Sequence, residues 1–326
     1  MIEKWIKKQY EGFNVYERNV FGCFFNIRSL GKTGDSQKVI QYISAVKAYL
    51  ICKWQRYRKK DIYIRYVEIP ITTRCTLNCK ECNNLIQVYQ EPVNYCTSRI
   101  LRDIKRICSV SEKIEMLRIL GGEPLVHPDL SEILLELKKI DKIKHVQVVT
   151  NGTLLFDRKS LLVLKNKKFS VDISNYGTHS GKFKELVEQL EKHRVYYITQ
   201  KEQKPWKSIS RCTCRKRSER ELKRVFALCR EDCHSLLDGE LHLCARSSHG
   251  TDLELIPKRV GEFIDVRNAT SKRAIKRQLY ELMNREWITA CDYCDMFRLN
   301  EMDTVPSAEQ ISKREGERLM REWKEG

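Results

Sequence analysis

The sequence predicts an α/β protein built on a parallel β-sheet. The prediction rests on strand-like runs, on the helical patterns that alternate with them, and on the chain length. From residue 66 onward, runs rich in β-branched and aromatic residues alternate with helical patterns. Parallel strands need such helical crossovers, so the alternation indicates either a barrel or a doubly wound sheet. The chain has 326 residues with 41% hydrophobic content, which is enough to bury one large domain and a smaller one.

Residues 1–65 are expected to form a helical extension ahead of the sheet. Large apolar side chains recur at helical spacing between Val39 and Tyr57, and a basic run follows. Such a helix can lie on an anionic membrane surface. Amphipathicity is also the ordinary signature of a helix packed on its own domain, and we favour that interpretation. The apolar residues are Val39, Ile43, Val46, Leu50 and Trp54, and the basic residues are Arg56, Arg58, Lys59 and Lys60.

Five strands and three helices are expected between residues 66 and 205. The strands are expected at 66–72, 116–120, 145–150, 169–174 and 195–199. Thr97 is expected to cap the first helix, and Asp129 with Glu132 has the pattern of a capping box for the second. A third helix is expected through Phe183 and Leu190.

The pattern changes after about residue 206, so residues 206–326 are expected to form a small second domain with its own metal site. A basic, cysteine-rich stretch leads to short strands around Gly239 and to helices near 270–287 and 306–323. The densest basic patch either holds a phosphate or forms a solvated face. It consists of Arg211, Arg215, Lys216 and Arg217.

The charge and the cysteine content indicate the cellular compartment, the role of the cysteines and the class of partner. Charged residues interrupt the N-terminal segment where a signal peptide would be apolar, and no run approaches about 18 apolar residues, so we expect a cytoplasmic protein. Fourteen cysteines in that reducing compartment indicate metal or catalytic roles rather than disulfides. The formal charge of +18 fits an anionic partner, such as nucleic acid, an acidic lipid surface or a phosphorylated substrate, and equally a basic surface with none.

Cys75, Cys79 and Cys82 form a CxxxCxxC sequence just after the first expected strand. Three thiolates at this spacing can hold three irons of a [4Fe–4S] cluster and leave the fourth iron open to a small molecule. A structural zinc site is the alternative, but zinc usually takes four protein ligands. We therefore expect an iron–sulfur cluster on these three cysteines.

This cysteine triad, together with Gly121-Gly122-Glu123 after the second strand, resembles the radical S-adenosylmethionine (SAM) superfamily. The resemblance implies a partial (β/α)6 barrel in residues 66–205 that cleaves SAM reductively to a 5′-deoxyadenosyl radical. It also implies that Gly121, Gly122 and Glu123 contact the SAM amino group. An electron donor such as flavodoxin or ferredoxin is implied as a partner.

Two further positions are expected to face SAM and the substrate, and one departs from the pattern. Asn151 follows the third strand and Ser174 the fourth, where the resemblance implies polar groups directed at the SAM ribose and the substrate. The superfamily usually has an aromatic residue just before the third cysteine, but this chain has Glu81. The contact with the SAM adenine is therefore expected to differ.

A second set of cysteines resembles the auxiliary-cluster domain called Twitch. Cys229 and Cys244 flank Gly239 in the pattern Cx9Gx4C, and Cys291 and Cys294 follow as CxxC. The resemblance implies one auxiliary [4Fe–4S] cluster on these four thiolates, whereas the longer SPASM domain would need further cysteines after Cys294. Cys233 either replaces Cys229 as a ligand or gives a hydrogen atom to a substrate radical.

The remaining cysteines receive no such role. A small buried hydrophobe is the commonest fate of a free cysteine, and it is the expectation for Cys23, Cys52, Cys96 and Cys108. Cys212 and Cys214 stay unassigned, because they lie in a basic segment that would lower their pKa values.

The resemblance favours dehydrogenation or epimerisation of a carbohydrate-type small molecule, with a phosphorylated or nucleotide-linked substrate suiting the basic patch. A peptide-modifying maturase is the second hypothesis, although no leader-peptide recognition domain is evident. An RNA-binding modification enzyme is the third, and nucleic acid is disfavoured because few aromatic residues interleave the basic runs. Glu123 argues against the last hypothesis, a non-catalytic iron–sulfur protein.

Overall fold

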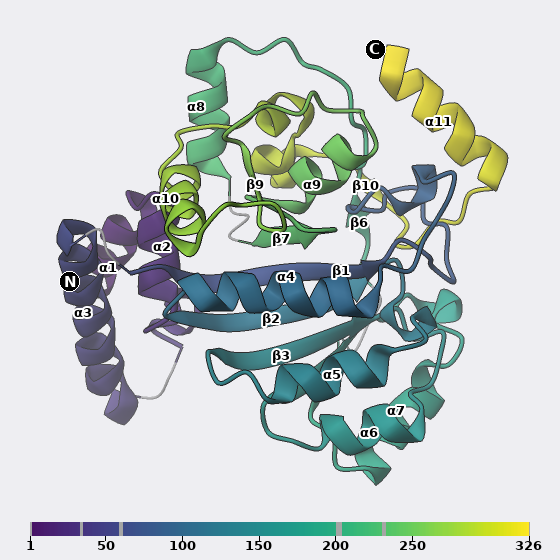
Figure 1. The fold of residues 1–326 in the computed structure, drawn as a ribbon, viewed down its shortest axis with the longest axis horizontal. Coiled ribbons are helices and arrows are strands. Elements are labelled where there is room, and N and C mark those ends of the chain that lie inside the picture. The colour runs from purple at the N-terminus through teal and green to yellow at the C-terminus, as the bar shows by residue number, and fades with distance from the viewer. Residues whose placement is uncertain (1, 33–34, 59–60, 200–203, 230–232, 326) are drawn as a thin grey trace.

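A single eight-stranded sheet forms the centre of the computed structural model, which describes residues 2–32, 35–58, 61–199, 204–229 and 233–325. The strand order is β5-β4-β3-β2-β1-β7-β8-β9 (Figure 1). Strands β1 to β5 are parallel, β7 continues parallel beside β1, and β8 and β9 are antiparallel. The strands are β1 Tyr63–Thr72, β2 Lys113–Gly121, β3 Ile143–Thr150, β4 Phe169–Ile173, β5 Tyr197–Thr199, β7 His234–Leu237, β8 Glu240–His242 and β9 Phe263–Asp265.

Four helices connect the consecutive parallel strands; the sequence predicts three of them, and the helix between β3 and β4 was not expected. They are α4 Thr97–Val110, α5 Leu130–Lys138, α6 Arg158–Leu164 and α7 Phe183–Lys192, and α4 and α5 pass in front of β1 to β3 in Figure 1. Their apolar stripes and the strands share one buried core, in which Ile104, Leu117 and Leu134 are almost fully buried. Each such side chain contributes about 1.5–3 kcal/mol on burial. The predicted α/β class with a parallel sheet is thus confirmed.

The expected helix caps are not formed, because two helix starts are tied to each other. Thr97 is the first residue of α4 rather than its cap, and its hydroxyl donates a 2.8 Å hydrogen bond to Asp129 Oδ2. Asp129 occupies the N-cap position of α5 but its side chain caps no backbone N–H there. A tertiary contact therefore takes the place of the capping box.

The N-terminal extension consists of α1 (Ile2–Glu11), α2 (Val15–Gly22) and α3 (Asp35–Arg58). The inner face of α3 is made of small side chains, since Ala45, Ala48 and Cys52 are fully buried. The apolar stripe predicted to pack on the domain instead faces outward, so that interpretation was wrong. Val39, Ile43, Leu50 and Trp54 are all exposed, and Val46 is half-buried.

The C-terminal region contains the helices α8 Glu219–Leu228, α9 Ala245–Asp252, α10 Lys272–Met283 and α11 Lys313–Glu325. The last two confirm the helices expected near 270–287 and 306–323. The short strands expected around Gly239 are the β7–β8 hairpin, whose turn places Asp238 and Gly239 at positive φ. A separate ribbon pairs β6 (Trp206–Lys207) antiparallel with β10 (Thr304–Val305).

Short 3-10 turns complete the chain, at Ile27–Ser29, η2 Ile86–Val88, Pro124–Val126, Gly177–His179, Thr289–Tyr293 and Met296–Glu301. None of the helices in the described residues combines the length and apolar character needed to cross a bilayer. The carboxyl ends of β1, β2, β3 and β4 lie along one edge of the sheet because the strands are parallel. Ligands of parallel α/β sheets bind at this edge.

Candidate active site

The loop after β1 brings Cys75, Cys79 and Cys82 together. Ionisation of Cys82 raises the pKa of both other thiols, so the three sulfur atoms are near one another. Burial is the main cause of the pKa of about 12 at Cys75 and at Cys79, and it also raises the pKa of Cys82. Thiols in such a site lose their protons when a metal takes the proton's place.

Two glycines let the next loop lie directly on the cysteine loop. Gly121 has φ +155°, and a Cβ there would stand 2.1 Å from the carbonyl oxygen of Thr72. A Cβ at Gly122 would stand 2.2 Å from the carbonyl oxygen of Arg74. Because no larger residue fits either contact, Gly121 and Gly122 set the position of the two loops relative to each other.

Glu123 is fully buried and joins the ends of β2 and β3. Its carboxylate accepts hydrogen bonds from the Thr150 hydroxyl (2.9 Å), the Asn151 backbone N–H (2.7 Å) and the Leu125 backbone N–H (3.1 Å). Desolvation nevertheless raises its pKa from 4.5 to about 7. The sequence indicates a contact with SAM alone, whereas in the structure Glu123 is also a brace between two loops.

Asn151 braces the cysteine loop from the end of β3. Its Nδ2 donates to Thr76 Oγ1 at 3.0 Å and lies 3.6 Å from Cys75 Sγ, while its Oδ1 accepts from Thr153. Ser174, at the end of β4, is half-buried, and its backbone N–H donates to the Thr150 carbonyl at 2.9 Å. Both residues lie at the expected edge, and their contact with SAM stays a prediction.

The four cysteines of the second set also converge. Ionisation of Cys229, Cys291 and Cys294 each raises the pKa of the buried Cys244 thiol. All four line one cavity of about 550 Å³. Cys233 does not line that cavity, so the structure places Cys229 rather than Cys233 with the other three.

No group of three or more His, Cys, Asp or Glu side chains within the described ranges has the spacing to hold a single metal ion.

The basic patch around Cys212 holds the second cysteine loop in place. Arg215 and Arg217 both form ion pairs with Asp295, at 2.8 and 2.5 Å, and all three side chains are largely buried. Arg217 also donates to the Cys291 carbonyl at 2.8 Å and to the Cys294 carbonyl at 3.0 Å. These two arginines are thus committed within the protein, which removes them from the predicted phosphate site.

Cys212 and Cys214, the two cysteines left unassigned, lie in the same basic segment. Cys214 Sγ donates to Asp292 Oδ2 at 3.1 Å, and Cys212 is fully buried, with its pKa sensitive to Cys294. Cys23, Cys52 and Cys108 are buried as expected. Cys96 is exposed at the N-cap of α4, where hydrogen bonds lower its pKa, so the buried role expected for it was wrong.

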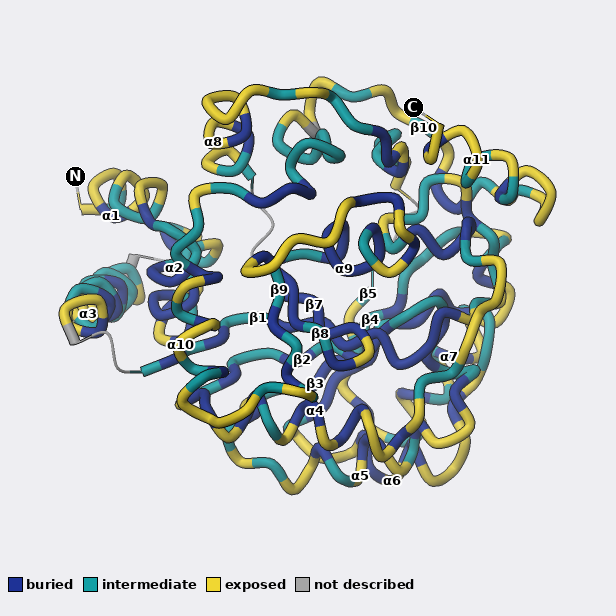
Figure 2. Tube along the Cα trace, turned by 45° about the horizontal axis from the view of Figure 1, so that its top comes forward, coloured by how far each residue is buried: buried dark blue, intermediate teal, exposed yellow. Residues whose placement is uncertain are grey.

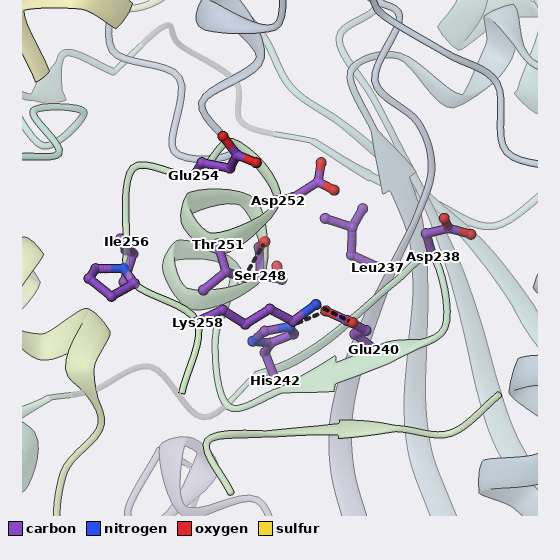
Figure 3. A pocket seen from close by; sticks show the side chains of 11 residues that line it. Leu237, Asp238, Glu240, His242, Ser248, Thr251, Asp252, Glu254, Ile256 and Lys258 are labelled. Carbon is purple, nitrogen blue, oxygen red and sulfur yellow. Dashed lines mark hydrogen bonds and ion pairs between the residues drawn. The ribbon is translucent and has the colours of Figure 1, made fainter. Parts of the chain in front are cut away.

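A second cavity of about 460 Å³ lies against α9 and the β7–β8 hairpin (Figure 3). Four carboxylates line it, but Glu240 is paired with Lys258 and Asp252 accepts a 2.7 Å hydrogen bond from the Tyr89 hydroxyl. Neither cysteine set lies in its lining, and we assign it no role.

A profile described as the Radical SAM superfamily matches residues 69–231, which is half of the chain and includes the cysteine triad and Glu123. The chain belongs to the radical SAM superfamily. Its resident groups are therefore a [4Fe–4S] cluster and SAM, and the close-set, buried thiols of Cys75, Cys79 and Cys82 fit that cluster.

Curated relatives with this domain are similar over part of their length. "GTP 3′,8-cyclase" of Clostridium perfringens is 31% identical over 150 residues, covering 44% of this chain and 45% of the relative. "Molybdenum cofactor biosynthesis protein 1" of Dictyostelium discoideum is 30% identical over 162 residues, covering 49% of this chain and 24% of the relative. The chain thus spans less than half the length of these relatives.

Two of the similar solved structures contain bound S-adenosylmethionine (AdoMet). BtrN in complex with AdoMet and 2-DOIA has a TM-score of 0.44 at 15% identity, covering 77% of this chain and 98% of its own. Streptococcus suis SuiB bound to S-adenosylmethionine has a TM-score of 0.37 at 16% identity, covering 53% and 41%. No inference about substrate follows from likeness at this level.

Glu81, at the position where the resemblance implies an aromatic residue, ties the cysteine loop to a distant segment. Its carboxylate accepts from the Ser210 backbone N–H at 2.8 Å and from the Ser208 hydroxyl at 3.2 Å. An aromatic group approaches the triad from elsewhere. Tyr176 is near enough for all three thiols to raise its pKa, and its ring meets Trp206 edge-on at 5.2 Å.

Arg246 links the two cysteine sites of this radical SAM enzyme. It is almost fully buried, donates to the Ser210 carbonyl at 2.8 Å and lines the cavity of the second cysteine set. Its charge acts to lower the pKa of Cys82 and of Cys212, against the larger effect of burial. Sequence reasoning missed this residue, because nothing in its local sequence marks it.

Sequence reasoning also missed Gln310, which contacts Cys79 in the CxxxCxxC loop. Residues 308–311 lie antiparallel to the cysteine loop, and the Lys80 backbone N–H donates to the Glu309 carbonyl at 2.8 Å. Gln310 Nε2 donates to Cys79 Sγ at 3.3 Å, and its Oε1 accepts from the Asn78 N–H at 2.7 Å. The C-terminal segment is thus part of the catalytic cluster site.

We expect Gln310→Glu to shift the reduction potential of the catalytic cluster to a more negative value. Hydrogen bonds to cluster sulfurs help set the potential, and a glutamate keeps an oxygen for the Asn78 N–H while replacing the donor that faces Cys79. An EPR-monitored redox titration measures the shift. Glu309→Gln is the matched control, because Glu309 pairs with Lys80 on the surface of the same segment. Equal potentials in both variants would contradict the role.

Proposed function

We propose that this radical SAM enzyme abstracts a hydrogen atom from an uncharged or amine-bearing small molecule of carbohydrate type, and that Cys229, Cys244, Cys291 and Cys294 hold an auxiliary [4Fe–4S] cluster. When bound, the catalytic cluster and SAM supply the 5′-deoxyadenosyl radical that removes the hydrogen atom. A row of polar side chains across the sheet carries the substrate part of the proposal.

The row follows from the strand register. Side chains alternate between the two faces of a sheet, and paired residues of neighbouring strands share a face. The pairs Glu68↔Ser235, Glu68↔Arg118, Arg118↔Gln147 and Gln147↔Ser170 therefore set five polar side chains side by side across β7, β1, β2, β3 and β4. The intervening residues, such as Val67 and Leu117, are apolar and fully buried on the other face.

The charge of this row argues against a phosphate ligand. Arg118 pairs with Asp172 at 2.7 Å and with Glu68 at 3.4 Å, and it also donates to the Tyr66 hydroxyl. Two carboxylates thus surround one guanidinium, leaving a net charge of −1 on this group. Hydroxyl and ammonium groups suit such a surface, whereas a phosphate would meet net repulsion.

Cys233 lies on the same face, at the level of Tyr66. The register Val67↔His234 places Cys233 opposite Tyr66, one pair of residues from the polar row, which is about 7 Å along the strand. Its thiol is buried, and it acts on the pKa of Tyr66. This position supports the proposal that Cys233 returns a hydrogen atom from its S–H group to a carbon radical held over the row.

A nucleotide substrate is the second candidate. The relatives named GTP 3′,8-cyclase favour it, and several cations line the cavity of the second cysteine set. They are Arg18, Lys223, Arg246 and Arg285. In this case the phosphates would bind beside the auxiliary cysteines rather than over the polar row.

The two candidates are separated by substrate-dependent formation of 5′-deoxyadenosine. The anaerobically reconstituted protein is incubated with SAM, a reductant and, separately, neutral aminocyclitols and sugars, sugar phosphates or GTP, and the product is followed by mass spectrometry. We expect stimulation by the neutral or amine-bearing compounds. Stimulation by GTP alone would support the second candidate, and no stimulation by any of them would overturn the proposed substrate class.

Cys233→Ala is expected to uncouple hydrogen abstraction from inversion. If the product is an epimer, this variant should form 5′-deoxyadenosine but no inverted product, and the wild-type enzyme in deuterated water should place deuterium at the inverted carbon. The thiyl radical left on Cys233 then takes up one electron and one proton from the external donor. Dehydrogenation would leave no solvent label, because the substrate radical then loses an electron to the proposed auxiliary cluster and a proton to solvent.

The iron content provides the control for the Cys233 variant. Cys233→Ala should keep about eight irons per chain, whereas Cys229→Ala should fall toward about four, by the stoichiometry of two cubane clusters. Loss of iron in Cys233→Ala with none in Cys229→Ala would make Cys233 the ligand and contradict its role as a hydrogen donor.

A further inference from the structure

Helix α3 lies at the end of the molecule where β1 begins (Figures 1 and 2), and large apolar side chains are exposed along its outer side. Six large side chains form it, and we name them the α3 outer face. They are Val39 (62% exposed), Ile40 (65%), Ile43 (50%), Leu50 (59%), Trp54 (57%) and Tyr57 (83%).

The α3 outer face is one stripe along the helix, in which Lys47 stands between Ile43 and Leu50. At 3.6 residues per turn its six members fall within an arc of about 100°, opposite the buried Ala45, Ala48 and Cys52. From Val39 to Tyr57 it extends about 27 Å along the helix. Contiguous apolar patches of this kind mark interaction sites on soluble domains, whereas scattered exposed residues do not.

The charges around the stripe are positive. Lys47 is exposed within its arc, and α3 contains Asp35 as its single acidic residue. Lys53 and Arg56 share one partner, Glu17, at 3.4 and 2.8 Å, so one positive charge of this group is left without a counterion of its own. The surroundings of the stripe thus carry excess positive charge.

Helix α1 extends the same surface. Trp5 is exposed and its ring contacts Tyr49 of α3 at 5.0 Å, and Lys4 and Lys8 are exposed beside it. Tryptophan and tyrosine at the edge of an apolar surface, with lysine and arginine around it, are typical of helices that lie in the headgroup region of a bilayer.

We propose that α1 and the α3 outer face lie on an anionic lipid membrane, parallel to its surface. A second copy of the chain is the competing occupant, but it would bring another basic surface of a chain with net charge +18 against this one. Anionic headgroups complement the basic residues, and the acyl region takes the apolar stripe. The loop that carries Cys75, Cys79 and Cys82 follows the opposite end of β1, so a bound membrane leaves the catalytic edge open (Figure 1).

Sedimentation of the full chain with vesicles tests the proposal. We expect the protein to bind vesicles of phosphatidylcholine with phosphatidylglycerol, to bind phosphatidylcholine alone much less, and to lose binding as salt rises. Ile43→Glu with Leu50→Glu should weaken binding by about tenfold or more, because carboxylates replace apolar contacts and are repelled by the lipid. Thermal unfolding verifies that this variant is folded.

Leu162→Glu is the matched control, since Leu162 on α6 is as exposed as Leu50, at 59%, and lies outside the α3 outer face. It should bind vesicles as the wild-type protein does. Equal binding by wild type and the Ile43/Leu50 variant, or no binding of wild type to anionic vesicles, would overturn the proposal. A dimer in light scattering that the same two substitutions dissociate would overturn it as well, in favour of a second copy.

Discussion

Replacing Cys75, Cys79 and Cys82 with alanine is expected to lower the iron content from about eight to about four atoms per chain and to abolish SAM cleavage. The three thiols are the only protein groups proposed to hold the catalytic cluster, and the open iron that would chelate SAM depends on them. Iron and sulfide analysis measures the loss, and 5′-deoxyadenosine formation measures the activity.

The complementary variant separates the two sites. Alanine at Cys229, Cys244, Cys291 and Cys294 should remove the other four irons, about half of the total, and leave some SAM cleavage, because these thiols form a separate group. Cys108→Ala is the control, since this cysteine is buried in α4 and belongs to neither cysteine set. Zinc in place of iron, or unchanged iron in the first variant, would contradict the assignment.

The core of the fold was predictable because its signals are local. Each expected strand between residues 66 and 205 is present, extended by up to three residues at its start or shortened by up to two, and the helices between them follow their apolar periodicity. The pairing of β7 with β1 was not predictable, because the partners Val67 and His234 are far apart in the sequence. The pairing of β6 with β10 was not predictable for the same reason.

The same distinction holds for the site. Cys75, Cys79 and Cys82, and the pair Cys291 and Cys294, were recognisable because each group lies within one short segment, whereas Cys229 and Cys244 stand on either side of the β7–β8 hairpin and were grouped with them through the resemblance. Gln310 and Arg246 were missed because their partners are distant in sequence, at Cys79 and Ser210. The basic patch was misread for the same reason. Arg215 and Arg217 look free in sequence, and Asp295, which neutralises them, lies almost eighty residues away.

The outward stripe of α3 illustrates a limit of periodicity. Residues from Val39 to Trp54 at helical spacing indicate an apolar face but not what it contacts. The face that packs on the domain carries small residues, Ala45 and Ala48, which hydrophobicity patterns weigh little. The larger apolar face was therefore assigned to the wrong side of the helix.

Glu123→Gln is expected to change the stability of the SAM-free protein as a function of pH. Burial raises the pKa of Glu123 from 4.5 to about 7, so between these values the folded state holds a proton that the unfolded state has released. The stability from this group is present below pH 4.5 and is lost as the pH rises through 7, by about 3 kcal/mol in total. The glutamine variant should lack this part of the pH dependence in denaturant titrations.

The same variant tests whether Glu123 also faces the SAM ammonium. A bound cation favours the carboxylate, so SAM should stabilise the wild-type protein more at pH 8 than at pH 6, and Glu123→Gln should bind SAM more weakly by about 1.5–3 kcal/mol. Glu123→Ala is a different change, because it leaves the Thr150 hydroxyl and the N–H groups of Asn151 and Leu125 without their acceptor, at about 1–3 kcal/mol each. We expect the alanine variant to lose catalytic iron as the brace on Asn151 loosens. Unchanged SAM affinity in Glu123→Gln, together with iron loss in Glu123→Ala, would limit Glu123 to the role of a brace.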